Sequence, residues 1–259
     1  MKNGIIVASF GTTYEETRKL CIESIENRIK ERYKDCLVLR TFTSQMVINK
    51  LKRRDGYLVD NPKEALEKMK DNGVNSIYIQ PLHIIAGHEY EKLIEETKEF
   101  INENDDFHIQ VGKPLLYGYL DYIRVVEGLK LKAIEDGEAI VFMGHGTDHL
   151  ADESYKRLEN TFKNKGYKSV FIGTVEGKMT LEDIIPKLKE QKITRVRLMP
   201  FMLVAGDHAT NDMASDGEDS WKTKLMLEGF CVDVSLKGLG EMKSIQEIYI
   251  NHLENILKN

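Results

Sequence analysis

Two histidines of the sequence stand where they could bind a metal ion. His145 lies between two glycines directly after an apolar run, so the backbone can turn there and the imidazole stays accessible. His208 lies two residues after Gly206, and either Asp207 or Asp212 could orient its ring by a hydrogen bond. The alternative role of such a histidine is a hydrogen bond to the backbone of a turn. Packing in a core explains His145 poorly.

Glu89 is the third candidate ligand. It follows Gly87 and His88 at the expected start of a helix that continues through Phe100, so its alternative role is to stabilise that helix N-terminus. Two imidazoles and one carboxylate suit Co(II), Ni(II), Fe(II) or Zn(II), and they leave coordination positions open for chemistry. The sequence contains neither HExxH nor CxxC. The three ligands would therefore come from distant segments.

Other polar residues could take part in such a site. His83 and His88 could be further ligands or proton carriers, although His83, between Leu82 and Ile84, is better explained as a half-buried structural residue. A basic cluster consists of Lys50, Lys52, Arg53 and Arg54. A solvated helix face is its simplest explanation. The alternative is a clamp for a polycarboxylate ligand, because guanidinium groups bind carboxylates bidentately.

The elements that must position these residues follow an α/β pattern. Short apolar runs alternate with longer charged amphipathic stretches, as in parallel sheets covered by helices. Strands are predicted at 5–9, 37–42, 76–80, 107–111, 139–143, 169–172, 195–199 and 231–235. Thr13 and Glu16 predict a capping box for the first helix, Pro62 opens another helix that Gly73 closes, and a last helix is expected at 245–257.

An internal repeat relates the two halves of the chain. Residues 5–12 (IIVASFGT) match 140–147 (IVFMGHGT), and 80–89 (QPLHIIAGHE) match 199–208 (MPFMLVAGDH). In this alignment Phe10 corresponds to His145, and Glu89 corresponds to His208. The first half has about 16 extra residues between its two motifs, and 43–56 is the expected insertion.

We therefore expect an α/β fold of two similar Rossmann-like lobes, near 1–125 and 126–259, each a parallel sheet flanked by helices. A pseudo-twofold axis would relate the lobes across a cleft, and the last helix would cross back onto the first lobe. Ligands of open α/β sheets bind beyond the carboxyl ends of the strands, where both motifs lie. His145, His208 and Glu89 are thus predicted to meet in that cleft.

Composition excludes several classes of protein. The chain has 259 residues, 41% hydrophobic and 31% charged, which is typical of a globular protein and not of a disordered one. No apolar run is long enough for a membrane span or a signal peptide, so a cytoplasmic protein is expected. The net charge of -5 argues against nucleic acid as a partner. No nucleotide-binding motif occurs, and Cys21, Cys36 and Cys231 are expected to be small core residues.

The segments around these positions resemble a known family. The motifs are SFGT at 9–12, TFTS at 41–44, LHIIAGHEYEK at 82–92, MGHG at 143–146 and LVAGDHATNDMASD at 203–216. They are similar to those of the anaerobic cobalt chelatases of cobalamin (vitamin B12) biosynthesis, the sirohydrochlorin cobaltochelatases of the class II chelatase superfamily. The resemblance extends from Gly4 to about Glu241.

The resemblance implies a lyase that inserts Co(II) into sirohydrochlorin without ATP and releases two protons. It implies no organic cofactor, Co(II) as the substrate metal, and a metal held by His145, His208 and Glu89. We expect neutral His145 to be the catalytic base that accepts a pyrrole proton. The candidate residues for binding the polycarboxylate ring are Ser9, Phe10, Gly11, Thr12, His83, His88, Arg53 and Arg54. Family members are commonly homo-oligomeric, so a homo-oligomer is expected.

Other functions stay open at this point. An iron or nickel chelatase on the same tetrapyrrole would use the same ligand types, because these separate divalent metals poorly. A tetrapyrrole or metal carrier would bind without metallating the ring. A metal-dependent hydrolase would hold its metal tightly and activate a water molecule.

Overall fold

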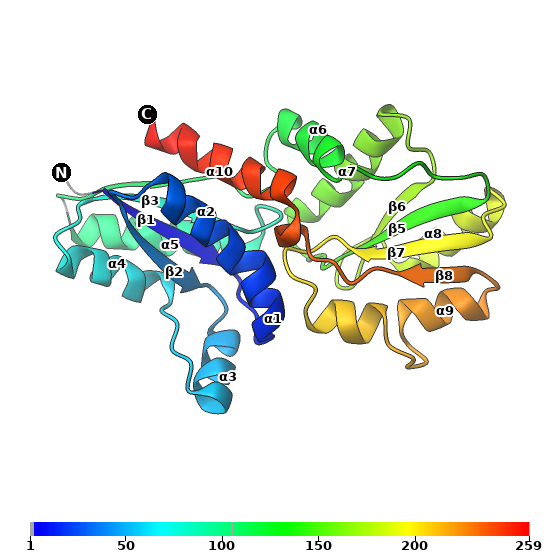
Figure 1. Ribbon diagram of the computed structural model, residues 1–259, viewed down its shortest axis with the longest axis horizontal. Coiled ribbons are helices and arrows are strands. Elements are labelled where there is room, and N and C mark those ends of the chain that lie inside the picture. Colours follow the sequence, from blue (N-terminus) through cyan, green and yellow to red (C-terminus); the bar gives the residue numbers. More distant parts are fainter. Residues whose placement is uncertain (1–2, 105, 259) are drawn as a thin grey trace. The chain divides into compact units, whose positions relative to one another are not determined.

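The computed structural model describes residues 3–104 and 106–258, and within them the chain forms two compact units. Unit 1 contains the residues up to Tyr117 together with those from Lys243 onward. Unit 2 contains the continuous stretch Gly118–Met242. Each unit has one four-stranded parallel sheet flanked by helices, as predicted from the alternation of apolar and amphipathic segments (Figure 1).

The sheet of unit 1 has the strand order β2-β1-β3-β4. Its strands are β1 (Asn3–Ser9), β2 (Leu37–Phe42), β3 (Ser76–Pro81) and β4 (His108–Val111). Its helices are α1 (Glu15–Thr17), the π-helix η1 (Arg18–Glu23), α2 (Ser24–Arg32), α3 (Gln45–Asp55), α4 (Pro62–Asp71), α5 (His88–Glu103) and α10 (Lys243–Leu257).

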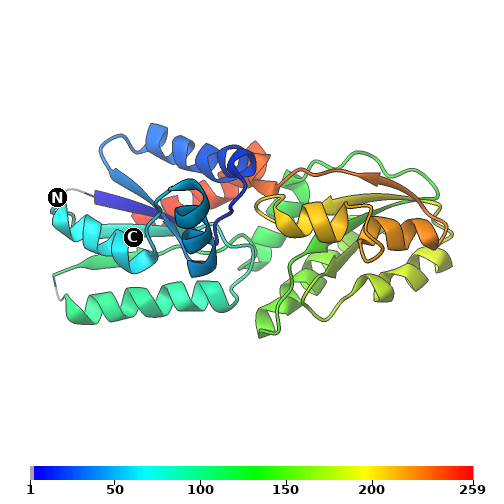
Figure 2. The same cartoon turned by 90° about the horizontal axis from the view of Figure 1, so that it is seen from below.

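Helices cover both faces of this sheet (Figure 2). Ile6 and Ala8 of β1 point toward α4 and α5, and they pack with Leu66, Leu93 and Phe100 in one buried core. Helices α2 and α10, which contact each other, cover the opposite face. Side chains alternate between the faces of a strand, so a strand buried on both sides is apolar at nearly every position.

The sheet of unit 2 repeats this topology with the order β6-β5-β7-β8. Its strands are β5 (Glu138–Gly144), β6 (Val170–Thr174), β7 (Arg195–Pro200) and β8 (Cys231–Val234). Its helices are α6 (Tyr119–Gly128), the 3-10 turn η2 (Leu150–Asp152), α7 (Glu153–Asn164), α8 (Leu181–Glu190), the π-helix η3 (Ala209–Met213), α9 (Trp221–Leu227) and the 3-10 turn η4 (Leu239–Glu241).

Two separate cores hold the helices of unit 2 against its sheet. Val141 of β5 packs on one face with Ile184 of α8, Met213 of η3 and Trp221 of α9. On the other face the ring of Phe142 stacks against Phe162 of α7, with the centroids 5.8 Å apart. Both faces of the sheet are therefore covered by apolar side chains. The ends of the strands are the part of the sheet where polar groups can bind a ligand.

The internal repeat is visible in backbone hydrogen bonds. The Leu82 N–H donates to Ala8 O at 2.7 Å, and the Phe201 N–H donates to Met143 O at the same distance. The Thr12 hydroxyl accepts from the Tyr14 N–H at 3.2 Å, and the equivalent Thr147 hydroxyl accepts from the His149 N–H at 3.1 Å. Helix α3 has no counterpart between β6 and α8, so the predicted insertion is confirmed.

Some details differ from the sequence predictions. The predicted boundary near residue 125 falls inside α6, because α6 packs on α7 and belongs to unit 2. The capping box of Thr13 and Glu16 does not form, since the helix begins at Glu15 with Tyr14 as an N-cap that makes no side-chain cap bond.

The cysteines differ in their burial. Cys21 is buried as predicted, whereas Cys231 is exposed at the start of the edge strand β8. None of the helices in the described residues is both long enough and apolar enough to cross a membrane.

Candidate metal-binding site

His145 follows β5 directly and lies in a tightly packed loop. Gly146 has φ +80°, and a Cβ atom there would lie 2.3 Å from Gly177 N, so only glycine fits. A Cβ atom on Gly144 would lie 2.5 Å from the ring of Tyr155. The glycines on both sides of His145 therefore serve close backbone packing, and the imidazole itself remains half-exposed.

The hydrogen bond of the His145 ring determines which nitrogen is available. Its Nδ1 lies 3.0 Å from Gly146 O, and because a carbonyl oxygen only accepts, Nδ1 is the donor. In the neutral ring Nε2 then has a free lone pair. This nitrogen can bind a metal ion or accept a proton.

His208 is oriented by a carboxylate of its own helical turn. Its Nδ1 lies 2.6 Å from Asp212 Oδ2, inside the π-helix η3 that follows the loop after β7. Of the two predicted partners, Asp212 thus contacts the ring, while Asp207 accepts from the side chain of Asn211 at 3.1 Å. A histidine held in this way presents Nε2 as a ligand atom.

The structure brings the two histidines together with a carboxylate that the sequence analysis missed. The ring centroids of His145 and His208 are 4.7 Å apart, and the rings are perpendicular. Glu176 joins them: His145, His208 and Glu176 each offer one ligand atom, and these atoms lie within 4.8 Å of one another. Two nitrogens and one oxygen suit a borderline divalent metal ion, and the partial exposure of the three side chains leaves coordination positions open.

Backbone hydrogen bonds hold Glu176 beside His145. The Glu176 N–H donates to His145 O at 2.8 Å, and the Val175 N–H donates to Gly144 O at 3.1 Å. Glu176 follows β6, which is the neighbour of β5 in the sheet. An acidic residue before a glycine at the end of that strand was the available signal, but it becomes meaningful only when the strand order is known.

The equivalent positions of unit 1 lack most of these ligands. The Ser44 N–H donates to Phe10 O, just as the Glu176 N–H donates to His145 O, so Phe10 and Ser44 occupy the positions of the latter two residues. Glu89 is equivalent to His208 by sequence alignment. A phenyl ring and a hydroxyl replace an imidazole and a carboxylate, so these positions of unit 1 lack two of the three ligands.

Three polar atoms near the carboxyl ends of β1 and β3 are buried without a hydrogen-bond partner among the described residues. They are Ser9 Oγ, His83 Nδ1 and Glu89 Oε2. Burial lowers the pKa of His83 to about 4, so its ring is neutral at neutral pH. Glu89 lies in the first turn of α5, as predicted. Buried polar atoms without partners are uncommon and are typical of sites that receive a ligand.

The other predicted site residues have different environments. Phe10 is 42% exposed, and Gly11 has φ +95°, where a Cβ atom would lie 2.5 Å from the ring of Phe42. Thr12 is buried and bonds to the backbone of Tyr14. His88 is exposed at the first position of α5.

The basic cluster lies on the exposed face of α3, which favours the solvated-face explanation. The Arg54 guanidinium forms a bidentate ion pair with Asp55, both distances being 2.7 Å, and it also donates to Thr13 O. Arg53 donates to Asn49 O at 3.3 Å within its own helix. Lys50 and Lys52 are exposed.

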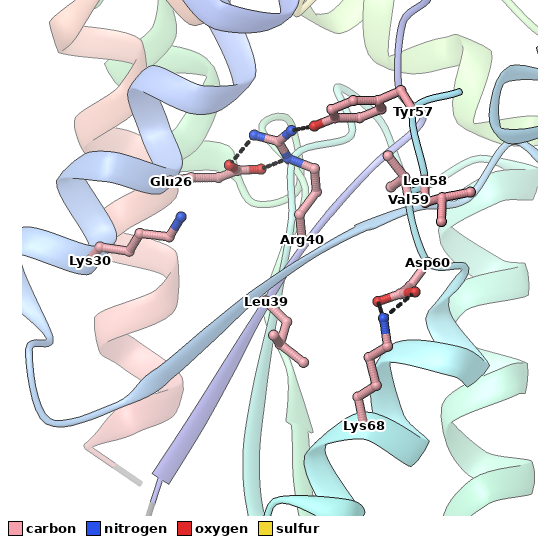
Figure 3. Close-up of a pocket in the computed structure, with 9 residues that line it drawn as sticks. All are labelled: Glu26, Lys30, Leu39, Arg40, Tyr57, Leu58, Val59, Asp60 and Lys68. Atoms are coloured by element: carbon pink, nitrogen blue, oxygen red, sulfur yellow. Dashed lines mark hydrogen bonds and ion pairs between the residues drawn. The ribbon is translucent and has the colours of Figure 1, made fainter. Parts of the chain in front are cut away.

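A pocket of about 370 Å³ lies elsewhere in unit 1, beside the edge strand β2 (Figure 3). Four of its charged groups form two pairs: Arg40 donates to both carboxylate oxygens of Glu26, and Lys68 lies 2.6 Å from Asp60 Oδ2. None of the predicted site residues lines this pocket. We therefore assign it no part in metal binding.

Comparison with known proteins places the chain in a family. Residues 3–258 match the family model described as cobalt chelatase (CbiK). The sirohydrochlorin cobaltochelatase of Salmonella typhimurium is 38% identical over 259 residues, covering 99% of this chain and 97% of the relative. The sirohydrochlorin cobaltochelatase CbiKC of Nitratidesulfovibrio vulgaris is 34% identical over 261 residues, covering 97% of this chain and 89% of the relative.

Solved structures share the fold at lower sequence identity. SirB from Bacillus subtilis with Fe3+ has a TM-score of 0.72 at 15% identity, with 98% of this chain and 95% of that chain covered. The sirohydrochlorin chelatase SirB from Bacillus subtilis subspecies spizizenii in complex with cobalt has a TM-score of 0.69 at 14% identity, with 100% and 97% covered. The chelatase fold is thus confirmed, and the full-length family match shows that this chain belongs to the cobalt chelatase (CbiK) family.

Proposed function

We propose that this protein inserts Co(II) into sirohydrochlorin, with the metal as a substrate and with no organic cofactor. The observation that carries the proposal is the His145, His208 and Glu176 set, which is partly exposed and has both imidazoles oriented by hydrogen bonds. Family membership and the names of the two relatives above agree with this activity. A metal that is a substrate must also leave, and a site with only three ligands and open positions suits transient binding.

The proposed reaction begins with Co(II) bound to Nε2 of His145, Nε2 of His208 and a carboxylate oxygen of Glu176. Pyrrole nitrogens of the macrocycle then replace these ligands one after another, and each of the two pyrrole N–H groups loses a proton. When His145 releases the metal, its Nε2 lone pair becomes free to accept one of these protons, and the other proton passes to water. His145 is therefore proposed as both metal ligand and catalytic base.

Residues of unit 1 are proposed to serve the macrocycle and the metal. Glu89 is proposed as a further metal ligand, because one of its carboxylate oxygens is buried without a partner. The other candidates for substrate binding remain Ser9, Phe10, Gly11, Thr12, His83, His88, Arg53 and Arg54. Support is strongest for Ser9 and His83, since each has a polar atom that lacks a hydrogen-bond partner among the described residues. It is weakest for Arg54, whose guanidinium is already paired with Asp55.

The test is an anaerobic absorbance assay of sirohydrochlorin with Co(II), Fe(II), Ni(II) or no metal. We expect fast conversion with Co(II) and a loss of about 100-fold or more in the His145→Ala variant, since both a ligand and a base are removed. His108→Ala is the matched control, because His108 is exposed on β4 and contacts none of the proposed ligands.

Each other outcome has a defined meaning. Near-normal turnover by His145→Ala would rule out the proposed base. A preference for iron or nickel would make the protein a chelatase for another metal on the same mechanism. Binding of the tetrapyrrole without conversion would make it a carrier.

A further inference from the structure

We infer that Asp152 is a positioning residue that holds the loops of His145 and Glu176 at metal-binding distance. The inference rests on the proposed function, because it assigns a role within the same site. Asp152 is the last residue of η2 and is only 6% exposed. It is neither a ligand nor a residue that the sequence motifs singled out.

The two oxygens of the Asp152 carboxylate bond to two different loops. Oδ1 accepts from the Thr147 N–H at 3.2 Å, two residues after His145. Oδ2 accepts from the Lys178 N–H at 3.0 Å, two residues after Glu176. An ionised carboxylate only accepts, so it satisfies both donors at once and ties the loops together.

Close packing makes this connection rigid. A Cβ atom on Gly177 would lie 2.3 Å from Asp152 Oδ1, and a Cβ atom on Gly146 would lie 2.3 Å from Gly177 N. The two loops thus approach each other closely through the backbones of Gly146 and Gly177. A shift of either loop would change the distance between the imidazole of His145 and the carboxylate of Glu176.

The repeat supplies an internal comparison. Thr17 lies as far beyond Thr12 as Asp152 lies beyond Thr147. Its hydroxyl donates to Tyr14 O at 3.1 Å, within its own helical turn, and it makes no bridge to a second loop. The carboxylate bridge is therefore found in the copy that has the metal ligands and not in the copy where Phe10 and Ser44 replace them.

The experiment measures Co(II) affinity of the full chain by anaerobic titration with the metal alone, followed by its visible absorption spectrum. Asp152→Asn keeps the size of the side chain but places an amide N–H against one of the two backbone N–H groups. We expect the Kd for Co(II) to rise about tenfold, as is usual for residues that orient metal ligands. The KM for Co(II) should rise more than kcat falls.

Glu159→Gln is the matched control. Glu159 is also a buried carboxylate that accepts a backbone N–H, from Ile172 at 3.1 Å, but it contacts neither loop. Both variants should lose thermal stability, and only Asp152→Asn should lose Co(II) affinity. In a His145→Ala background the effect of Asp152→Asn should be smaller, because one of the two ligands that Asp152 positions is then missing.

A folded Asp152→Asn variant that binds Co(II) within twofold of the wild type would overturn the inference. If this variant does not fold, the Gly177→Ala variant tests the inference instead. Its methyl group would displace the Asp152 carboxylate, while Asp152 itself is kept. Unchanged affinity there would be equally decisive against the inference. Sirohydrochlorin turnover by the wild type tests the proposed function separately, since the titration uses no tetrapyrrole.

Discussion

Asp212 determines which nitrogen of His208 is available to the proposed metal ion. Its carboxylate accepts from Nδ1 at 2.6 Å, which leaves Nε2 unprotonated. We expect Asp212→Ala to raise the Kd for Co(II) about tenfold with little change in stability, because the ring then rotates and exchanges tautomers freely. Isothermal titration with Co(II) measures this.

Asp207→Ala is the control for this prediction. Asp207 is adjacent in sequence to His208 but bonds to the Asn211 side chain, so its removal changes local charge without releasing the ring. Equal losses of affinity in the two variants would mean that the acidic surroundings matter rather than ring orientation.

His83 gives the stability of the fold a pH dependence with a predictable sign. Burial lowers its pKa from 6.5 to about 4, so between these values the unfolded chain binds a proton that the folded chain does not. Stability is therefore unaffected above pH 6.5 and falls as the pH drops toward 4. We expect a loss of about 2 kcal/mol between pH 7.5 and pH 5 from this residue.

Urea unfolding at the two pH values checks this prediction in the wild type and in His83→Gln, which cannot titrate. The free energy of unfolding should fall less in the variant than in the wild type as the pH is lowered. His108→Gln, at an exposed position, should follow the wild type. If the free energy of unfolding falls equally in His83→Gln and in the wild type, His83 takes up its proton as readily in the folded chain as in the unfolded chain, and the prediction is wrong.

At the scale of the elements, several strands could be predicted closely because they are apolar and largely buried. The strand predicted at 76–80 corresponds to β3 (Ser76–Pro81), and the strand predicted at 169–172 corresponds to β6 (Val170–Thr174). A continuous apolar run that ends at glycine, proline or polar residues locates such a strand without tertiary information. The capping box of Thr13 and Glu16 failed because several residues in a row there can begin a helix, and local sequence does not choose among them.

The site could be predicted only as far as the repeat and the strand ends allowed. His145 and His208 come from motifs whose strands, β5 and β7, are direct neighbours, so their approach follows from a general rule for open sheets. The proximity of Glu176 to His145 depends on which strand lies on the other side of β5. The contacts of Asp152 depend on how two loops pack. Both are long-range properties that spacing along the chain does not encode.

At the scale of the whole molecule, one unit is continuous in sequence and the other is not. Residues 118–242 contain a complete sheet, its two cores and all three residues of the proposed metal-binding set. We expect this stretch, made alone, to fold and to bind Co(II) with about the affinity of the intact chain. Circular dichroism and Co(II) titration measure the two properties.

A folded fragment that fails to bind Co(II) would show that a ligand from unit 1, with Glu89 as the first candidate, is needed for affinity. The complementary stretch 1–117 is expected not to fold, because it lacks α10. In the intact chain the Tyr249 hydroxyl donates to Leu82 O at 3.1 Å, and Arg28 of α2 donates to Glu247 and to Gln246 of α10.

The division of unit 1 also sets an order of events during synthesis. The ribosome makes β1 and α2 first, but α10, which covers the same face as α2, emerges only after residues 118–242. At about 5–20 residues per second, making residues 118–257 takes roughly 7 to 28 s. During this interval β3 and α2 lack their contacts with α10, whereas unit 2 can fold as soon as it has left the exit tunnel. We therefore expect the nascent chain to bind chaperones through unit 1 while unit 2 is already folded.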